Sequence, residues 1–253
     1  MMALGWNGEI QLETQLRGNM QPDYTRINIA QTQERVEKIL HEPGKFVTKI
    51  KKSDQILWNN LNSKVRLVVL YADVVDSTMM AQTLPPEKLA TMMETFSREM
   101  SLVVLQFNGF VLKYVGDAII AYFPIESSFE NVCNDVLHCS QNMITVLKDA
   151  VNPILQKHGY DELKIRIGVD TGDHSVVEYV LGEKHEVDIL GYGISIAAKI
   201  SNIAKPNQAI ITHKIFFAMN PSMRKDFTQI EWDPRVWKYF NEGSQSGVWE
   251  SSF

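Results

Sequence analysis

The sequence predicts an α+β domain with the ferredoxin-like element order β-α-β-β-α-β, in which helices cover a mainly antiparallel sheet. Short apolar runs rich in Val, Ile and Leu are typical of strands, and they occur at 66–72, 118–123 and 164–170. Longer segments at 86–107 and 130–157 instead carry apolar residues at helical spacing. The alternation of these two kinds of segment is what favours the α+β class.

A helical extension is expected before this domain. Residues 1–25 are polar and aperiodic, which indicates disorder. From about 27 to 40 the apolar residues fit one side of an amphipathic helix, which the breakers in His41-Glu-Pro-Gly-Lys45 end. Ser53 is expected to cap a short second helix, from Asp54 to Leu61.

We therefore divide the chain into an N-terminal extension, residues 1–62, and a domain of residues 63–253 with its core at about 64–218. Pro85-Pro86-Glu87 opens the first long helix of the domain, because proline is tolerated in a first helical turn. Pro153 is expected to kink the second long helix or to end its regular part.

Smaller elements are expected after the strand at 164–170. Leu190 ends a further strand, and Gly191-Tyr-Gly193 turns into a third helix that runs through Ala204. Residues 208–212 form another strand, and the tryptophan-rich segment 220–253 suits a closing β-hairpin.

Composition excludes several classes of protein. The 253 residues suit one domain plus an extension, and the net charge of −5 disfavours nucleic acid as a partner. No apolar run approaches the roughly 18–20 residues that span a bilayer, and the first residues do not resemble a signal peptide, so we expect a cytoplasmic protein without a membrane partner. The six histidines show no ligand spacing such as His-x-x-x-His.

Two aspartates lie at the ends of strand-like runs. Asp73 closes the run that begins at Arg66, and Asp117 opens the run that ends at Phe123. A carboxylate at the rim of a buried strand is costly unless it is paired or coordinates a metal. Two of them on neighbouring strand ends could hold two divalent cations, an arrangement that displaces leaving groups at phosphorus. The alternative is that each aspartate only caps a turn.

Four segments in order resemble the class III nucleotidyl cyclases, the adenylate and guanylate cyclases. They are 71–78 (Tyr-Ala-Asp-Val-Val-Asp-Ser-Thr), 108–123 (with Lys-Tyr-Val-Gly-Asp at its centre), 165–172 and 187–200. The resemblance covers about residues 64 to 218. It implies an adenylate cyclase, which converts Mg-ATP to 3′,5′-cyclic AMP and pyrophosphate by two-metal catalysis.

The resemblance also implies the metal and phosphate ligands. Asp73, Asp117 and the Val74 carbonyl would hold two Mg²⁺ or Mn²⁺ ions in each active site, since hard cations prefer oxygen ligands. Ser77 and Thr78 would face phosphate oxygens, although a plain helix cap explains each of them nearly as well.

Lys113 and Asp188 match the base-recognition pair of that family. Adenine offers N1 as an acceptor and its N6 amine as a donor, so a lysine and an aspartate complement it, whereas guanine has the opposite polarity. Cytosine shares the polarity of adenine, so these two residues alone do not exclude CTP. The alternative role for Lys113 is a salt bridge to a neighbouring acid.

Two positions depart from the family. Where it usually has an asparagine and an arginine that orient the ribose and stabilise the transition state, this chain has Ser195 and Lys199. Lysine keeps the charge but loses the bidentate fork of arginine. Loss of one such contact can cost about 10²–10³ in rate. The segment between Gly172 and Gly182 is also about two residues longer than we expect.

In the resembled family one chain supplies the metal ligands and another the base-recognition pair, which implies a homodimer with two shared sites. Two further functions stay open at this stage. One is a cyclase that acts on a pyrimidine nucleotide, and the other is a nucleotide-binding regulatory protein whose turnover is weakened by Ser195 and Lys199.

Overall fold

The structure is a computed structural model that describes residues 27–42, 55–126, 128–231 and 247–253. The predictions made for residues 1–25, for the breakers at 43–45 and for the Ser53 cap lie outside this part of the chain.

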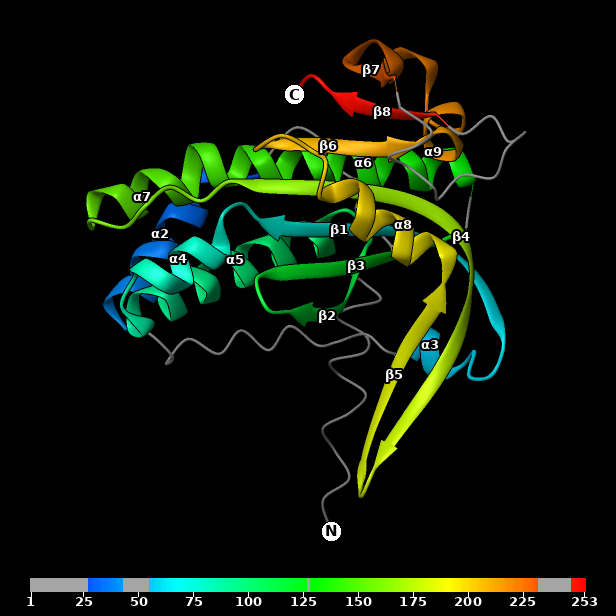
Figure 1. Cartoon of the computed structure of the whole chain (residues 1–253), viewed down its shortest axis with the longest axis horizontal. Coiled ribbons are helices and arrows are strands. Elements are labelled where there is room, and N and C mark those ends of the chain that lie inside the picture. The colour runs from blue at the N-terminus through cyan, green and yellow to red at the C-terminus, as the bar shows by residue number, and fades with distance from the viewer. Residues whose placement is uncertain (1–26, 43–54, 127, 232–246) are drawn as a thin grey trace.

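One eight-stranded sheet organises the domain (Figure 1). Its order is β2-β3-β1-β4-β6-β8-β7, and β5 pairs with β4 beside this path. The strands are β1 (Lys64–Val74), β2 (Phe110–Val115), β3 (Ala118–Pro124), β4 (Ile165–Leu181), β5 (Lys184–Gly191), β6 (Gln208–Thr212), β7 (Phe227–Ile230) and β8 (Val248–Ser251). Among the described pairings only β4 and β6 are parallel, so the predicted α+β class with a mainly antiparallel sheet is confirmed.

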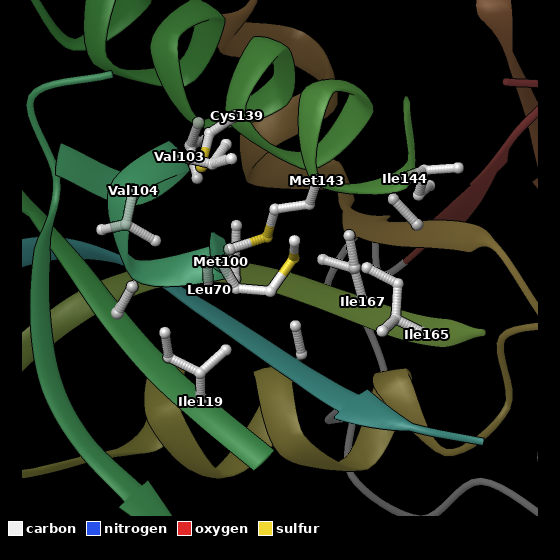
Figure 2. Close-up of a cluster of buried hydrophobic side chains, with 14 of the residues drawn as sticks. Leu70, Met100, Val103, Val104, Ile119, Cys139, Met143, Ile144, Ile165 and Ile167 are labelled. Atoms are coloured by element: carbon white, nitrogen blue, oxygen red, sulfur yellow. The ribbon is translucent and has the colours of Figure 1, made fainter. Parts of the chain in front are cut away.

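The helices are α2 (Ile29–His41), α3 (Gln55–Trp58), α4 (Ser77–Thr83), α5 (Pro86–Gln106), α6 (Phe129–Val146), α7 (Asn152–Lys157), α8 (Tyr192–Ser201) and α9 (His213–Ala218). Pro86 opens α5 as expected, and Asn108 follows its end at a φ of 62°, a conformation that asparagine tolerates. Figure 2 shows the main core, where Met100 of α5 and Met143 of α6 meet Leu70 and Ile167 of the sheet.

Helix α2 belongs to the same core as the rest of the domain. Val36 is fully buried in the main cluster, and Arg35 donates to the Glu99 carboxylate on α5 at 2.6 Å. Asn28 accepts a hydrogen bond from the Gln31 amide and so caps the helix. The predicted N-terminal helix is therefore present. The second predicted helix is shorter than expected, because α3 covers only Gln55–Trp58.

The long helix expected over 130–157 is three elements in the structure. Helix α6 ends at Val146, a π-helical turn covers Leu147–Val151, and α7 begins at Asn152. Pro153 sits in the first turn of α7, where its missing N–H and its ring prevent an α-helical bond to the preceding turn. In the π turn the Asn152 amide donates to the Leu147 carbonyl, five residues back, so the wider turn absorbs this mismatch.

Strand β4 is much longer than the predicted 164–170. It runs from Ile165 to Leu181, turns at Gly182 and returns as β5 (Figure 1). From the sequence, the segment between Gly172 and Gly182 was noted only as about two residues longer than in the resembled family. In the structure it forms half of a two-stranded arm that extends beyond the sheet. Val176 and Val187 of this arm pack into a second core cluster, whereas Tyr179, Val180 and Leu190 are exposed.

The remaining elements follow the prediction closely. Strand β6 has the predicted bounds, and β7 and β8 form the expected antiparallel pair. The third helix, α8, ends at Ser201 rather than at Ala204. Within the described ranges, no helix combines the length and the apolar character needed to cross a membrane.

Candidate active site

The two aspartates of the predicted metal centre lie next to each other. Asp73 pairs in register with Ala118, the residue after Asp117, so both carboxylates lie at one end of the β1–β3 pair. Tyr71 lies on the same strand as Asp73. Burial raises the pKa of its phenol, and the nearby charges of Asp73 and Asp117 raise it further. Tyr71 was not predicted as a site residue, although its place two residues before Asp73 on a strand puts it on the same face.

Asp73 has one carboxylate oxygen that no described residue satisfies. Its side chain is 11% exposed, and Oδ2 accepts a hydrogen bond from Arg166 at 2.9 Å, whereas the buried Oδ1 has no partner. Burial raises the pKa of Asp73 and the nearby Asp117 charge adds to this, while Arg166 and the Ser201 hydroxyl oppose it. A divalent cation would satisfy Oδ1, so the donor set fits a hard metal ion such as Mg²⁺.

Arg166 is a site residue that the sequence analysis missed. It lies directly opposite Asp73 in the antiparallel β1–β4 register, where cross-strand neighbours of opposite charge meet. In the sequence, Arg166 is only a charged residue between two isoleucines. The pairing partner becomes visible only when the register is known.

The structure brings the predicted base-recognition pair together. Lys113 of β2 donates to Asp188 Oδ2 on β5, and Asp188 Oδ1 accepts from the Ile189 amide at 2.8 Å. The side chain of Asp188 is 15% exposed and that of Lys113 37%, so the pair is held at a partly covered surface. Its role in binding a base stays a prediction.

A β-bulge sets the direction of Lys113. The register between β2 and β3 shifts between Val111 and Lys113, which leaves Leu112 without a partner on β3. Lys113 therefore lies opposite Ile120, which belongs to the core cluster on the sheet face away from α5 and α6. This is the face on which Leu112 also packs.

Helix α8 carries the two departures from the family pattern. A Cβ atom at Gly168 would lie 2.0 Å from the Ala197 carbonyl oxygen, so the glycine allows α8 to lie directly on β4. Ser195 is exposed and donates to the Gly191 carbonyl at 3.4 Å, and Lys199 is partly buried one helical turn further on. At this spacing the two side chains share a face of the helix.

Ser77 and Thr78 form the first turn of α4, three residues after Val74. Ser77 is partly buried and Thr78 is exposed. The preceding residue, Asp76, has a φ of 58° and makes no side-chain capping bond. Contact of these hydroxyls with phosphate stays a prediction, as does the Val74 carbonyl as a metal ligand.

His174 holds the start of α8, and the sequence analysis missed it. It is fully buried, its Nδ1 lies 2.9 Å from the Gly172 carbonyl, and its Nε2 accepts from the Ile194 amide at 3.1 Å. The ring is therefore neutral with the proton on Nδ1. A Cβ atom at Gly193 would lie 2.9 Å from the ring, so the glycine lets the turn close over it.

Stability should depend on pH through His174. Burial lowers its pKa, and the hydrogen bond to the Gly172 carbonyl and the Asp173 charge oppose this only in part. A lowered pKa means that the unfolded chain binds the proton first, so stability is fully present above about pH 6.5 and falls as the pH drops below it. We expect the free energy of unfolding, measured with urea, to fall less between pH 7 and pH 5 in His174→Ala than in the wild type.

His174→Ala should also lose about 1–3 kcal/mol at pH 7, because the Ile194 amide is left without its acceptor. The matched control is His185→Ala, which removes an exposed histidine of β5. His138 and His213 also have pKa values lowered by burial, so the difference between wild type and variant is the quantity to compare. If the free energy of unfolding falls by the same amount between pH 7 and pH 5 in the wild type and in His174→Ala, His174 is not the source of this pH dependence.

The comparison with known families identifies this arrangement. Residues 61–235 match the family model described as the adenylate and guanylate cyclase catalytic domain. The chain belongs to this family. It is a class III cyclase domain, and such domains act on nucleoside triphosphates, use divalent metal ions and usually form dimers.

Similar curated proteins differ in the nucleotide that their names give. A cytidylate cyclase of Escherichia coli is 24% identical over 153 residues, which are 57% of this chain and 33% of that protein. A uridylate cyclase of Rhodovulum sp. (strain MB263) is 22% identical over 205 residues, 77% of this chain and 83% of that protein. An adenylate cyclase of Anabaena cylindrica is 23% identical over 145 residues, which are 55% of this chain and 28% of that protein. The chain thus spans about a third of the first relative and most of the second.

Solved structures agree on the fold. The guanylyl cyclase Cya2 superposes with a TM-score of 0.64 at 17% identity, covering 75% of this chain and 93% of that one. The adenylyl cyclase CyaB from P. aeruginosa gives a TM-score of 0.61 at 18% identity, with 75% and 94% covered. The predicted class III cyclase fold is therefore confirmed.

Proposed function

We propose that this chain cyclises a nucleoside triphosphate whose base carries an amino group, ATP or CTP, to the 3′,5′-cyclic nucleotide and pyrophosphate. The observation that supports this proposal is the Lys113–Asp188 pair on β2 and β5. A lysine donor beside a carboxylate acceptor complements a ring nitrogen beside an exocyclic amine. Adenine and cytosine both present that edge, whereas guanine and uracil present the reverse.

The carboxylates of Asp73 and Asp117 are the proposed metal ligands. A divalent cation bound there would lower the pKa of the ribose 3′-hydroxyl and neutralise phosphate charge. Arg166 fixes the Asp73 carboxylate through Oδ2, which leaves Oδ1 for the cation. Lys199 is proposed to supply positive charge to the transition state, and Ser195 a hydroxyl to the ribose. Both are weaker groups than those usual in the family, so we propose a modest turnover.

ATP is the first candidate substrate, because the motifs resemble adenylate and guanylate cyclases and the Lys113–Asp188 pair favours adenine over guanine. CTP is the second, and a specific observation favours it, since several of the similar curated proteins are cytidylate cyclases. UTP is a third candidate, because two of the similar curated proteins are named uridylate cyclases. The donor and acceptor positions of the Lys113–Asp188 pair do not match uracil, so we rank UTP last.

The test is incubation of the purified chain with each of the four nucleotides and Mg²⁺ or Mn²⁺, with the products resolved by chromatography. We expect ATP or CTP to be cyclised in clear preference to GTP and UTP. Each mispaired buried group costs about 1–3 kcal/mol, which is roughly 5- to 150-fold in rate.

A charge-exchanged double variant, Lys113→Asp with Asp188→Lys, is the matched control, because it keeps an ion pair but reverses the donor and acceptor positions. The preference should then move toward GTP or UTP. Equal rates for ATP and GTP in the wild type, or a clear preference for UTP, would show that this pair does not select the base.

A further inference from the structure

A second group of metal-binding side chains lies outside the cyclase site, on the N-terminal helix. Glu37 and His41 are one turn apart on α2, and His158 follows the end of α7. The sequence shows no histidine spacing of a metal site, because the third residue comes from another element more than a hundred residues away.

The two imidazoles converge on one carboxylate oxygen. His158 Nε2 lies 2.7 Å from Glu37 Oε2, and His41 Nε2 lies 3.7 Å from the same atom. The two rings meet edge to face, with centroids 5.5 Å apart. The nearest ligand atoms of the three residues all lie within 4.8 Å of one another.

From this convergence we propose that Glu37, His41 and His158 form a Zn²⁺ site that joins α2 to the end of α7. Ligands of tetrahedral zinc lie about 3.3 Å apart, given Zn–N and Zn–O bonds of about 2.0–2.2 Å. The present spread is wider, but the His41 side chain is 69% exposed and can rotate inward. Water would complete the coordination.

Lys157 orients the Glu37 carboxylate and leaves its second oxygen open to a metal ion. Its Nζ lies 2.6 Å from Glu37 Oε1, the oxygen that does not face the imidazoles. This contact fixes the carboxylate with Oε2 toward both rings, and it also lowers the pKa of Glu37, so the carboxylate stays ionised. Orientation of a ligand by a hydrogen bond to its second atom is common in metal sites.

The site has a structural consequence for the chain. Helix α2 lies outside residues 61–235, which match the cyclase family, so two of the three ligands belong to the extension. Bound zinc would fasten that helix to the domain by a contact that the cyclase reaction does not require. The proposal therefore does not depend on which nucleotide is the substrate.

Calorimetric titration of the chelator-treated full chain with Zn²⁺ tests the site. An excess of Mg²⁺ is kept in the buffer to occupy the oxygen ligands of the cyclase site. We expect one Zn²⁺ per chain and a thermal unfolding midpoint that rises with Zn²⁺ concentration. His41→Ala and His158→Ala should each weaken binding at least about tenfold, since each removes one of three protein ligands.

Two controls make the result specific. His185→Ala removes an exposed histidine on β5 that also contacts a glutamate, and it should leave the titration unchanged. Co²⁺ should give the visible spectrum of a tetrahedral site in the wild type and lose it in His158→Ala. Absence of saturable binding, or binding that survives both His41→Ala and His158→Ala, would overturn the proposal.

Discussion

Asp73→Ala and Asp117→Ala are each expected to lower the rate of cyclisation by at least about 10²–10³, the usual cost of removing one group that stabilises transition-state charge. Asp73 has a buried oxygen free for a cation, and Asp117 lies beside it across the β1–β3 pair. The measurement is product formation at saturating Mg²⁺, with circular dichroism to confirm that each variant is folded.

Asp73→Asn is the more informative variant, because its amide oxygen can still accept from Arg166 while the charge is lost. It should be as inactive as Asp73→Ala but closer to the wild type in stability. Asp161→Ala, which removes an exposed aspartate in the loop before β4, serves as the matched control and should keep full activity. A folded Asp73 or Asp117 variant with near-wild-type turnover would rule out the proposed metal ligands.

The second large effect concerns assembly. We propose that one chain supplies Asp73 and Asp117 to a site and another chain supplies Lys113 and Asp188. Within a single chain the first pair lies at one end of the β1–β3 pair, whereas the second joins β2 to β5. A symmetric dimer would then contain two shared sites.

Mixing Asp117→Ala chains with Lys113→Ala chains should then restore activity that neither variant has alone. About half of the dimers are mixed, and in each of them one site carries both lesions and the other carries none. Roughly a quarter of wild-type activity should return once subunits exchange, by the pairing statistics of a two-fold interface. The measurement is product formation before and after mixing, with exchange verified by native mass spectrometry.

A mixture of Asp73→Ala with Asp117→Ala is the matched control. Both lesions then fall on the metal side, so every site in the mixed dimer is damaged and no activity should return. If exchange is complete and the Asp117→Ala and Lys113→Ala mixture also stays inactive, the shared-site proposal fails.

Much of the fold could be predicted because single segments carry its signals. Helix α5 has apolar residues at helical spacing between Pro86 and Asn108, and β1 and β3 are continuous apolar runs. The strand that ends at Leu190 was predicted, but the extension of β4 to Leu181 was not, because it forms only by pairing with β5 across the turn at Gly182. The π turn before α7 was missed because Pro153 shows that a helix is disturbed, but not how.

The candidate site, like the fold, could be predicted only in part from the sequence. Asp73, Asp117, Lys113 and Asp188 stand in recognisable motifs, and the structure brings each pair together. Arg166 and His174 were missed for a physical reason. Arg166 acquires its partner only through the β1–β4 register, and His174 binds two backbone groups, which a sequence pattern does not display.

The bulge in β2 decides which face of the sheet Lys113 occupies, and so whether the proposed base-recognition pair with Asp188 forms. If the same residues paired without the bulge, Lys113 would lie opposite Ile119, whose side chain lies in the core beneath α5 and α6. A relative could then conserve the lysine in an alignment and still withdraw it from Asp188. Loss of the bulge, with every motif residue retained, would therefore separate the proposed base-recognition pair and change the proposed substrate choice.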